Sequence, residues 1–130
     1  MEEIKVLSGA NSKEIGVRKL FVETYKNSPI DQSEILQNMG LYINRMNLSR
    51  LLFIDSIYKQ IINVHGVIIE FGVRWGQNLA LYINLRGIYE PYNYNRNIIG
   101  FDVDPESVEF CQKRFEKFIQ EKQNQLQLAA

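Results

Sequence analysis

The chain has 130 residues, of which 45% are hydrophobic and 23% charged, and its 15 basic residues balance its 15 acidic ones for a formal net charge of +0. This length suits one domain of about 100–150 residues and leaves little room for a second. The composition excludes a disordered tail, a collagen-like fibre and a coiled-coil rod. Because the charges cancel, the sequence predicts no general attraction to nucleic acid or to an anionic membrane.

Cysteine content and hydropathy favour a cytoplasmic location. The single cysteine, Cys111, forms no intrachain disulfide and no metal cluster. No apolar run approaches the roughly 18 residues that a membrane span needs. The N-terminal segment Met1–Lys5 lacks the basic-then-apolar order of a secretory signal. We therefore expect a cytoplasmic protein that does not contact a membrane.

Three helical segments are predicted before any strand. Ser12 is the expected N-cap of the first helix, and Asp31 with Glu34 has the spacing of a capping box that opens the second. Apolar residues at three- and four-residue steps define the third. We expect a helical region over 1–64, with helices at 13–25, 31–39 and 48–62.

From residue 65 the pattern changes to strand, glycine turn, helix, strand and helix. Val67–Phe71 is a short apolar run rich in β-branched residues, which is typical of a strand buried on both faces. This order predicts a parallel βαβ unit. The expected elements are a strand at 67–71, a helix at 77–86, a strand at 98–102 and a helix from 105. We expect a βαβα unit over 65–122 and a polar tail over 123–130.

A glycine turn and an acidic residue lie at the carboxyl ends of the two predicted strands. Gly72 and Gly76 follow the first strand, where glycine lets the backbone approach a ligand and helix N–H groups point toward it. Asp102 closes the second strand, where a carboxylate can accept hydrogen bonds from both ribose hydroxyls of a nucleoside cofactor. Ligands of open α/β sheets bind outside these strand ends, so both features are candidates for cofactor binding.

The spacing from Glu70 to Gly76 discriminates between cofactors. A dinucleotide fingerprint, G-x-G-x-x-G, requires glycine where this chain has Arg74, and the phosphate-loop pattern G-x-x-x-x-G-K-[ST] does not fit either. The carboxylate of Glu70 repels a phosphate but suits the sulfonium and ammonium groups of S-adenosylmethionine. S-adenosylmethionine is therefore favoured, and an NAD-dependent enzyme is the weaker alternative.

The segments Val67–Leu81, Leu85–Asn93 and Ile98–Asp102 resemble the macrocin O-methyltransferase family, and the similarity covers roughly residues 28–102. These are class I S-adenosylmethionine-dependent enzymes that include deoxyhexose O-methyltransferases. The resemblance implies an α/β, Rossmann-like fold with an N-terminal helical lead-in. It also implies methyl transfer to a small-molecule hydroxyl, with a sugar as the expected acceptor.

The resemblance also assigns the site residues. It implies that Glu70, Gly72 and Gly76 line the methionine part of the cofactor and that Asp102 binds the ribose. In relatives, the catalytic base and the carboxylates that bind a divalent metal come from a later part of the fold. No catalytic or metal-binding residue is therefore predicted in this chain, although the complete enzyme can use a metal.

The sequence contains only about two strands of a larger parallel sheet, which predicts an apparently truncated fold. Bared strand edges favour association, so we expect a homo-oligomer through the exposed sheet edge. The small sheet also supports an alternative of another kind. In that alternative, the chain is a non-catalytic remnant or interaction module that retains the βαβ scaffold.

Overall fold

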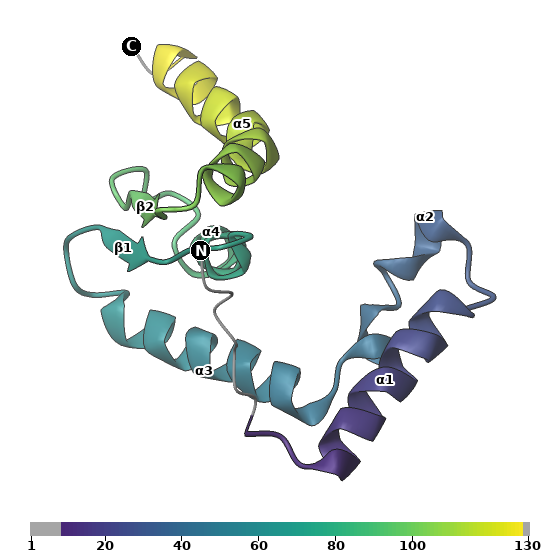
Figure 1. Cartoon of the computed structure of the whole chain (residues 1–130). Coiled ribbons are helices and arrows are strands. Elements are labelled where there is room, and N and C mark those ends of the chain that lie inside the picture. The colour runs from purple at the N-terminus through teal and green to yellow at the C-terminus, as the bar shows by residue number, and fades with distance from the viewer. Residues whose placement is uncertain (1–8, 129–130) are drawn as a thin grey trace. The chain divides into compact units, whose positions relative to one another are not determined.

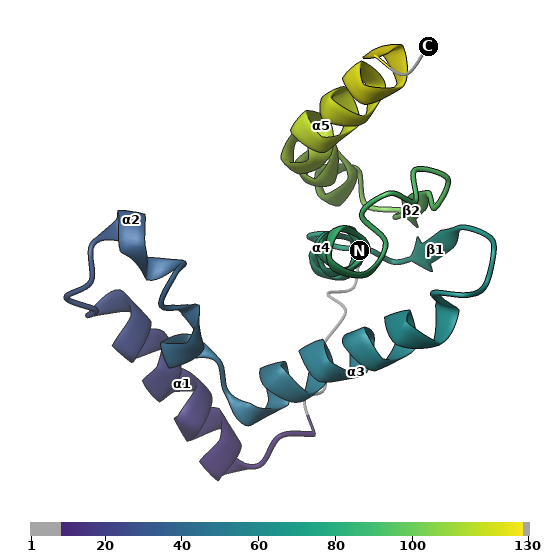
Figure 2. The ribbon, with the colours of Figure 1, turned by 180° about the vertical axis from the view of Figure 1, so that it is seen from behind.

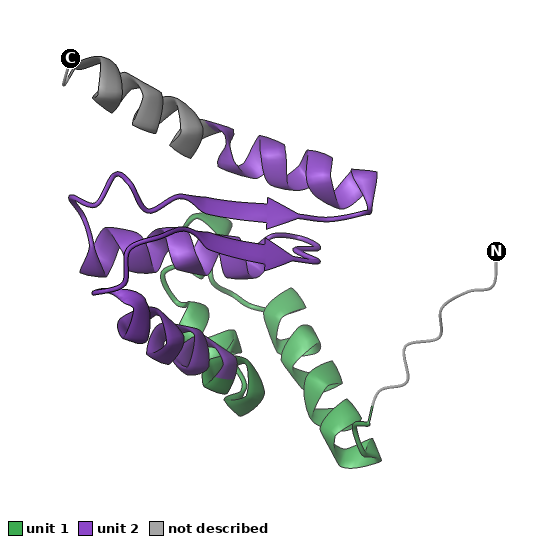
Figure 3. Cartoon of the chain, turned by 90° about the vertical axis from the view of Figure 1, so that its left-hand side faces the viewer, with its two compact units in different colours: residues 1–49 green, residues 50–130 purple. Residues whose placement is uncertain are grey.

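The computed structural model describes residues 9–128, with side chains described for residues 9–116, and the chain divides into two compact units. Unit 1 comprises residues 1–49 and unit 2 residues 50–130 (Figure 3). The sequence-based division at residues 64 and 65 separates two kinds of secondary structure and stays a prediction. Of the predicted polar tail, residues 123–128 are helical, and residues 129–130 lie outside the described residues.

Unit 1 is made of short helical elements whose ends are fixed by local hydrogen bonds. They are α1 (Ser12–Lys26), α2 (Gln32–Ile35) and the 3-10 helix η1 (Met39–Tyr42). The N-cap of α1 is Asn11 and not Ser12, because the Asn11 side chain accepts from the backbone N–H of Glu14 and the Glu14 carboxylate accepts from that of Asn11. None of the described residues 9–49 is buried.

Unit 2 contains the predicted strand–helix–strand–helix order. Its elements are α3 (Arg45–Ile61, from residue 50 on), β1 (Ile68–Phe71), α4 (Gln77–Tyr89), β2 (Ile98–Phe101) and α5 (Pro105–Leu128). The strands pair in parallel, with Ile68 opposite Ile98 and Phe71 opposite Phe101. Figures 1 and 2 show α4 beside the two strands, with α3 and α5 on either side of α4.

The core of unit 2 lies where α4 and α5 meet one face of the sheet. Val73, Leu79, Cys111 and Phe115 are buried together there. Gly100 permits this close packing: a Cβ at that position would lie 2.6 Å from a methyl carbon of Leu79 and 2.7 Å from one of Val73. Helix α4 can therefore approach β2 closely only because residue 100 has no side chain.

The opposite face of the sheet is exposed in the described structure. Ile69, Phe71, Ile99 and Phe101 lie on it, and the rings of Phe71 and Phe101 stack with centroids 5.4 Å apart. The side chain of Phe71 is 77% exposed. The prediction of burial on both faces is thus wrong for the described residues, because the helices that pack on the sheet cover its other face.

A buried ion pair holds the end of α3 to the segment that precedes β2. Arg96, which is 3% exposed, donates from Nε and Nη2 to the two carboxylate oxygens of Glu90 at 2.5 and 2.9 Å. It also donates to the carbonyls of Ile61 and Val64, both at 2.9 Å, where α3 ends. The hydroxyl of Tyr58 donates to Glu90 at 2.6 Å. This cluster lies at the amino ends of the strands, away from the glycine turn.

No helix in the described range 9–128 is both long and apolar enough to cross a bilayer.

Candidate cofactor-binding site

The turn between β1 and α4 depends on left-handed backbone conformations. Gly72, Arg74 and Gly76 have φ values of 76°, 50° and 73°, a region that side chains with a Cβ rarely occupy. The backbone N–H of Gly76 donates to the carbonyl of Val73 at 2.8 Å, which closes the turn directly before α4. The predicted glycine positions are therefore those at which the backbone reverses from strand to helix.

The two glycines of the turn have different surroundings. A Cβ at Gly76 would lie 2.9 Å from Sγ of Cys111 and 3.0 Å from a ring carbon of Phe115, so α5 packs directly on this residue. A Cβ at Gly72 would meet nothing within 4 Å. Gly72 therefore leaves the main chain open to a ligand, whereas both the positive φ and the packing of α5 account for Gly76.

Asp102 joins the end of β2 to the glycine turn. Its Oδ1 accepts from the N–H of Asp104 at 2.9 Å and its Oδ2 from the N–H of Arg74 at 2.7 Å. These backbone hydrogen bonds, that of Asp104 first, lower the pKa of Asp102. A carboxylate has about four acceptor positions, so positions for ribose hydroxyls remain.

Glu70 is held by a residue that the sequence reasoning missed. Asn78, in the first turn of α4, donates from Nδ2 to Glu70 Oε1 at 2.6 Å, and Arg50 of α3 donates to Asn78 Oδ1 at 3.1 Å. The second oxygen of Glu70, Oε2, is enclosed and has no hydrogen-bond partner among the described residues. The strand–turn–helix pattern places Asn78 near the turn, but no spacing rule pairs it with Glu70.

The carboxylates of Asp102 and Glu70 both influence the thiol of Cys111. Burial raises the pKa of the Cys111 thiol, and the charges of Asp102 and Glu70 raise it further. The Sγ of Cys111 donates to the carbonyl of Arg74, in the glycine turn, at 3.4 Å. The structure therefore brings Glu70, Asp102 and the turn together around the N-terminus of α4.

These residues fit S-adenosylmethionine better than a phosphate-containing cofactor. An enclosed carboxylate oxygen without a donor costs free energy, and an ammonium group is a donor that suits Glu70 Oε2. Two carboxylates in one site disfavour a pyrophosphate. Within the range whose side chains are described, no group of three or more His, Cys, Asp or Glu residues is arranged to hold a metal ion.

Two neighbouring residues do not join the site. Trp75 is about half exposed and packs edge-on against Phe110, with centroids 5.5 Å apart, which agrees with the packing of α5 on the turn. His65 is exposed in the turn before β1. It lies at the amino end of the strand, whereas the glycine turn follows the carboxyl end.

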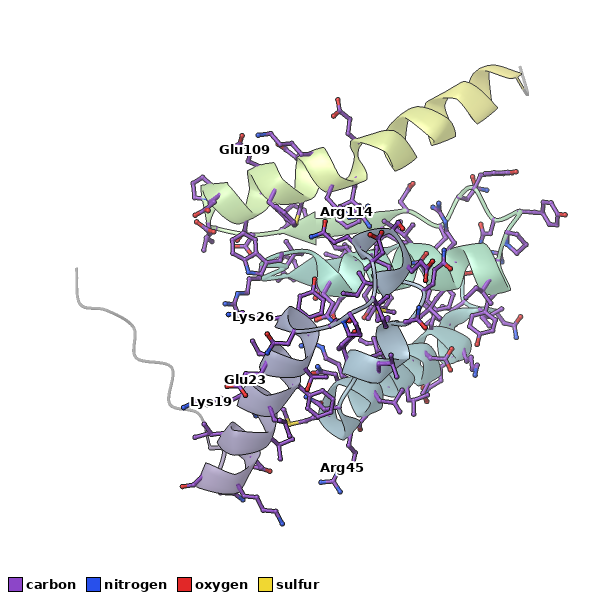
Figure 4. All side chains as sticks on the ribbon, turned by 90° about the vertical axis from the view of Figure 1, so that its right-hand side faces the viewer. Lys19, Glu23, Lys26, Arg45, Glu109 and Arg114 are labelled. Atoms are coloured by element: carbon purple, nitrogen blue, oxygen red, sulfur yellow. The ribbon has the colours of Figure 1, made fainter. Side chains whose placement is uncertain are left out.

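Unit 1 contains a separate groove of about 580 Å³. One wall is α1, and the hydroxyl of Tyr42 donates to Ser28 Oγ at 2.6 Å within the lining. Lys19 and Lys26 extend outward from α1 (Figure 4). The groove is lined by Leu20, Glu23, Thr24, Asn27, Ser28, Pro29, Ile30, Leu41 and Tyr42.

Comparisons with known proteins identify relatives among solved structures. No protein-family model matches the chain, and no curated protein matches it. The crystal structure of CalS11, a calicheamicin methyltransferase, is 37% identical with a TM-score of 0.70, over 78% of this chain and 40% of that chain. The apo structure of CalS11, described as a TDP-rhamnose 3′-O-methyltransferase in calicheamicin biosynthesis, is 34% identical with a TM-score of 0.75, over 86% of this chain and 50% of that one.

Over the matched region the chain is related to sugar O-methyltransferases, as the sequence resemblance implied. Its two parallel strands and flanking helices are part of a Rossmann-like α/β fold, which confirms the predicted fold class. The chain spans 40% and 50% of the lengths of the two matched chains. The assignment of Glu70, Gly72, Gly76 and Asp102 to a cofactor stays a prediction.

Proposed function

We propose that this chain is the cofactor-binding part of an S-adenosylmethionine-dependent O-methyltransferase that acts on a small-molecule hydroxyl. The observation that carries the proposal is the 34–37% identity to CalS11, with TM-scores of 0.70 and 0.75. Because CalS11 is described as a TDP-rhamnose 3′-O-methyltransferase, the acceptor that we propose is a hydroxyl of a nucleotide-linked deoxysugar.

S-adenosylmethionine, when bound, supplies an electrophilic methyl group on a sulfonium. This chain contributes by binding the cofactor and orienting it. The uncovered backbone at Gly72 would admit the ligand, Glu70 Oε2 would accept a hydrogen bond from its ammonium group, and Asp102 would accept hydrogen bonds from the ribose hydroxyls. Holding donor and acceptor aligned converts an encounter into an effectively unimolecular step.

Removal of the acceptor's proton needs a base or a metal. We propose that the base or the metal site is supplied by a segment equivalent to the part of CalS11 that this chain does not match. A divalent metal in the complete enzyme, held by carboxylates of that part, belongs to the same proposal.

The proposal also covers the cellular location and the oligomeric state of the chain. The cytoplasmic location that we propose is supported by the single cysteine, since small secreted domains usually contain disulfides. A homo-oligomer formed through the exposed sheet edge is supported by the two-stranded sheet, in which β1 and β2 each leave one edge unpaired among the described residues. Light scattering after size exclusion tests it, and a monodisperse monomer with a sharp unfolding transition would contradict it.

Calorimetric titration of the 130-residue chain with S-adenosylhomocysteine, and with NADH as a control, tests the cofactor assignment. We expect saturable binding of the first ligand alone. Gly72→Val should weaken that binding by about tenfold or more, because a β-branched residue disfavours φ of 76° and fills the space before the turn. His65→Ala, at an exposed position, is the control and should bind like the wild type.

Other outcomes distinguish the alternatives. Binding that survives in Gly72→Val contradicts the placement of the cofactor, and binding of NADH alone favours the dinucleotide enzyme. A folded chain that binds neither ligand supports a non-catalytic remnant or interaction module that keeps the βαβ scaffold. A methylated product from S-adenosylmethionine and TDP-rhamnose, detected by mass spectrometry, would show that this chain turns over.

A further inference from the structure

A chain of side-chain hydrogen bonds leads to Glu70, and the binding roles proposed above include neither of its other two members, Asn78 and Arg50. It runs from Arg50 through Asn78 to Glu70, with distances of 3.1 Å to Asn78 Oδ1 and 2.6 Å from Asn78 Nδ2. A guanidinium only donates and an ionised carboxylate only accepts. The amide of Asn78 therefore has a single orientation that satisfies both neighbours, with its oxygen toward Arg50 and its nitrogen toward Glu70.

This arrangement makes the two oxygens of Glu70 unequal. Oε1 accepts the short hydrogen bond from Asn78, whereas Oε2 is enclosed with no partner among the described side chains. A carboxylate that is not held turns easily about its last bond, because that torsion is broad and two-fold. The contact with Asn78 therefore fixes which oxygen of Glu70 remains for a further donor.

We propose that Asn78 is a positioning residue for the cofactor's amino-acid end. It holds Glu70 Oε1 so that Oε2 is the acceptor for the ligand's ammonium group, and Arg50 anchors the Asn78 amide from α3. The inference rests on the proposed function, since it concerns the same binding site. It adds that α3 and α4, which the glycine pattern does not include, set the geometry of that site.

The position of Asn78 explains why this side chain can do so. It is the second residue of α4, which begins at Gln77 directly after the turn. Helical side chains lean toward the N-terminus of their helix, and so the Asn78 amide reaches the residue that stands near the end of β1. Arg50 lies on α3, the helix that flanks α4, and its side chain is at the surface.

Two ligands separate positioning from general stability. S-adenosylhomocysteine carries the amino-acid end, whereas 5′-methylthioadenosine shares the thioether nucleoside and lacks that end. In Asn78→Leu, which removes the donor without adding charge, we expect calorimetry to show about tenfold weaker binding of S-adenosylhomocysteine and unchanged binding of 5′-methylthioadenosine. Asn78→Gln, which keeps an amide donor, should recover part of the loss.

Matched variants control the experiment. Asn84→Leu makes the same replacement on α4 at an exposed residue whose amide donates to the Ala80 carbonyl and to no other group of the described residues. This variant should bind both ligands like the wild type. Arg50→Leu, at the surface, should weaken S-adenosylhomocysteine by about threefold and leave the other ligand unaffected. Because Arg50 is exposed, this variant tests the inference even if Asn78→Leu fails to fold.

The outcomes are separable. If the variants of Asn78 and Arg50 lose both ligands equally, their role is structural and the inference is overturned. If they lose neither ligand, it is also overturned, while the proposed function stands. If the wild-type chain binds neither nucleoside, the proposed function fails and the inference fails with it.

Discussion

The two units use apolar side chains in opposite ways. In unit 2, Val73, Leu79 and Phe115 are buried together with Cys111 in one cluster. In unit 1, Leu20 and Leu41 are each 61% exposed, and no described residue of the unit is buried. Both units show apolar residues at helical spacing, so periodicity predicts the helix in each case. Whether the helix face is covered depends on a close approach. Gly100 permits one in unit 2, whereas a Cβ at Gly16 or Gly40 of unit 1 would meet nothing within 4 Å.

The two units also differ in the sequence separation of the residues that their hydrogen bonds join. Unit 1 relies mainly on local contacts such as the reciprocal pair of Asn11 and Glu14. Unit 2 contains side-chain contacts between residues about thirty positions apart, among them Tyr58 with Glu90 and Arg96 with Val64. Local contacts survive partial unfolding, whereas long-range ones are lost together. We therefore expect unit 2 to unfold cooperatively and to set the stability of the chain.

The largest expected effect is the loss of the buried cation in unit 2. Arg96→Met leaves the carboxylate of Glu90 buried without its counter-charge and removes the donor to the carbonyls at the end of α3. We expect a loss of about 3–5 kcal/mol in the free energy of unfolding, measured by urea titration with circular dichroism.

The same replacement in unit 1 is the control. Arg18 is exposed, and among the described residues its side chain hydrogen-bonds only to the sulfur of Met46, at 3.8 Å. Arg18→Met should therefore change the free energy of unfolding by less than about 0.5 kcal/mol. Equal effects of the two variants would contradict the contrast between the units.

Acid should weaken unit 2 through Glu90. Arg96, with Tyr58 and Asn93, lowers the pKa of Glu90 from an ordinary value of 4.5 to about 2. A carboxylate with a lowered folded-state pKa stabilises the fold fully above its unfolded pKa and loses this contribution as the pH falls through the folded value. We expect a contribution of about 3 kcal/mol at pH 7 that declines between about pH 4.5 and 2.

Comparison with Glu90→Gln isolates this effect from the other carboxylates. The difference in the free energy of unfolding between wild type and variant should be largest at neutral pH and should shrink below about pH 4.5. Urea titrations at several pH values measure it. A difference that stays constant down to pH 3 would show that Glu90 does not carry the acid sensitivity.

Much of unit 2 could be predicted because its signals are local. The apolar run before Gly72 and the glycines of the turn each define one boundary. From β1 on, the observed elements begin within about a residue of those expected, whereas α3 begins at Arg45 and not at residue 48. Unit 1 was harder. Ser12 and Asn11 are both good N-caps, and only the reciprocal bonds with Glu14 select Asn11. Helix α2 ends at Ile35 and not at Met39.

The candidate site shows the same limit. The glycine turn and Asp102 follow from strand-end chemistry, which depends on neighbours in sequence. The contacts of Asn78 with Glu70 and Arg50 join three elements, and the partners of an amide cannot be read from spacing. The exposed sheet face was also missed, because a run of apolar residues shows that a strand needs cover on both sides but not which segment supplies it.

The smallest expected effect uses one substitution in both units. In unit 2, Gly100→Ala places a Cβ against Leu79 and Val73, which are buried and cannot move away, and should cost about 1–3 kcal/mol. In unit 1, Gly16→Ala meets nothing within 4 Å inside α1 and should stabilise that helix by about 0.5–1 kcal/mol, because alanine loses less backbone entropy than glycine. Urea titration measures the first change, and hydrogen exchange of the α1 amides measures the second. Opposite signs would confirm that packing controls unit 2 and helix propensity unit 1, whereas a destabilised α1 in Gly16→Ala would mean that this face of the helix is covered in solution.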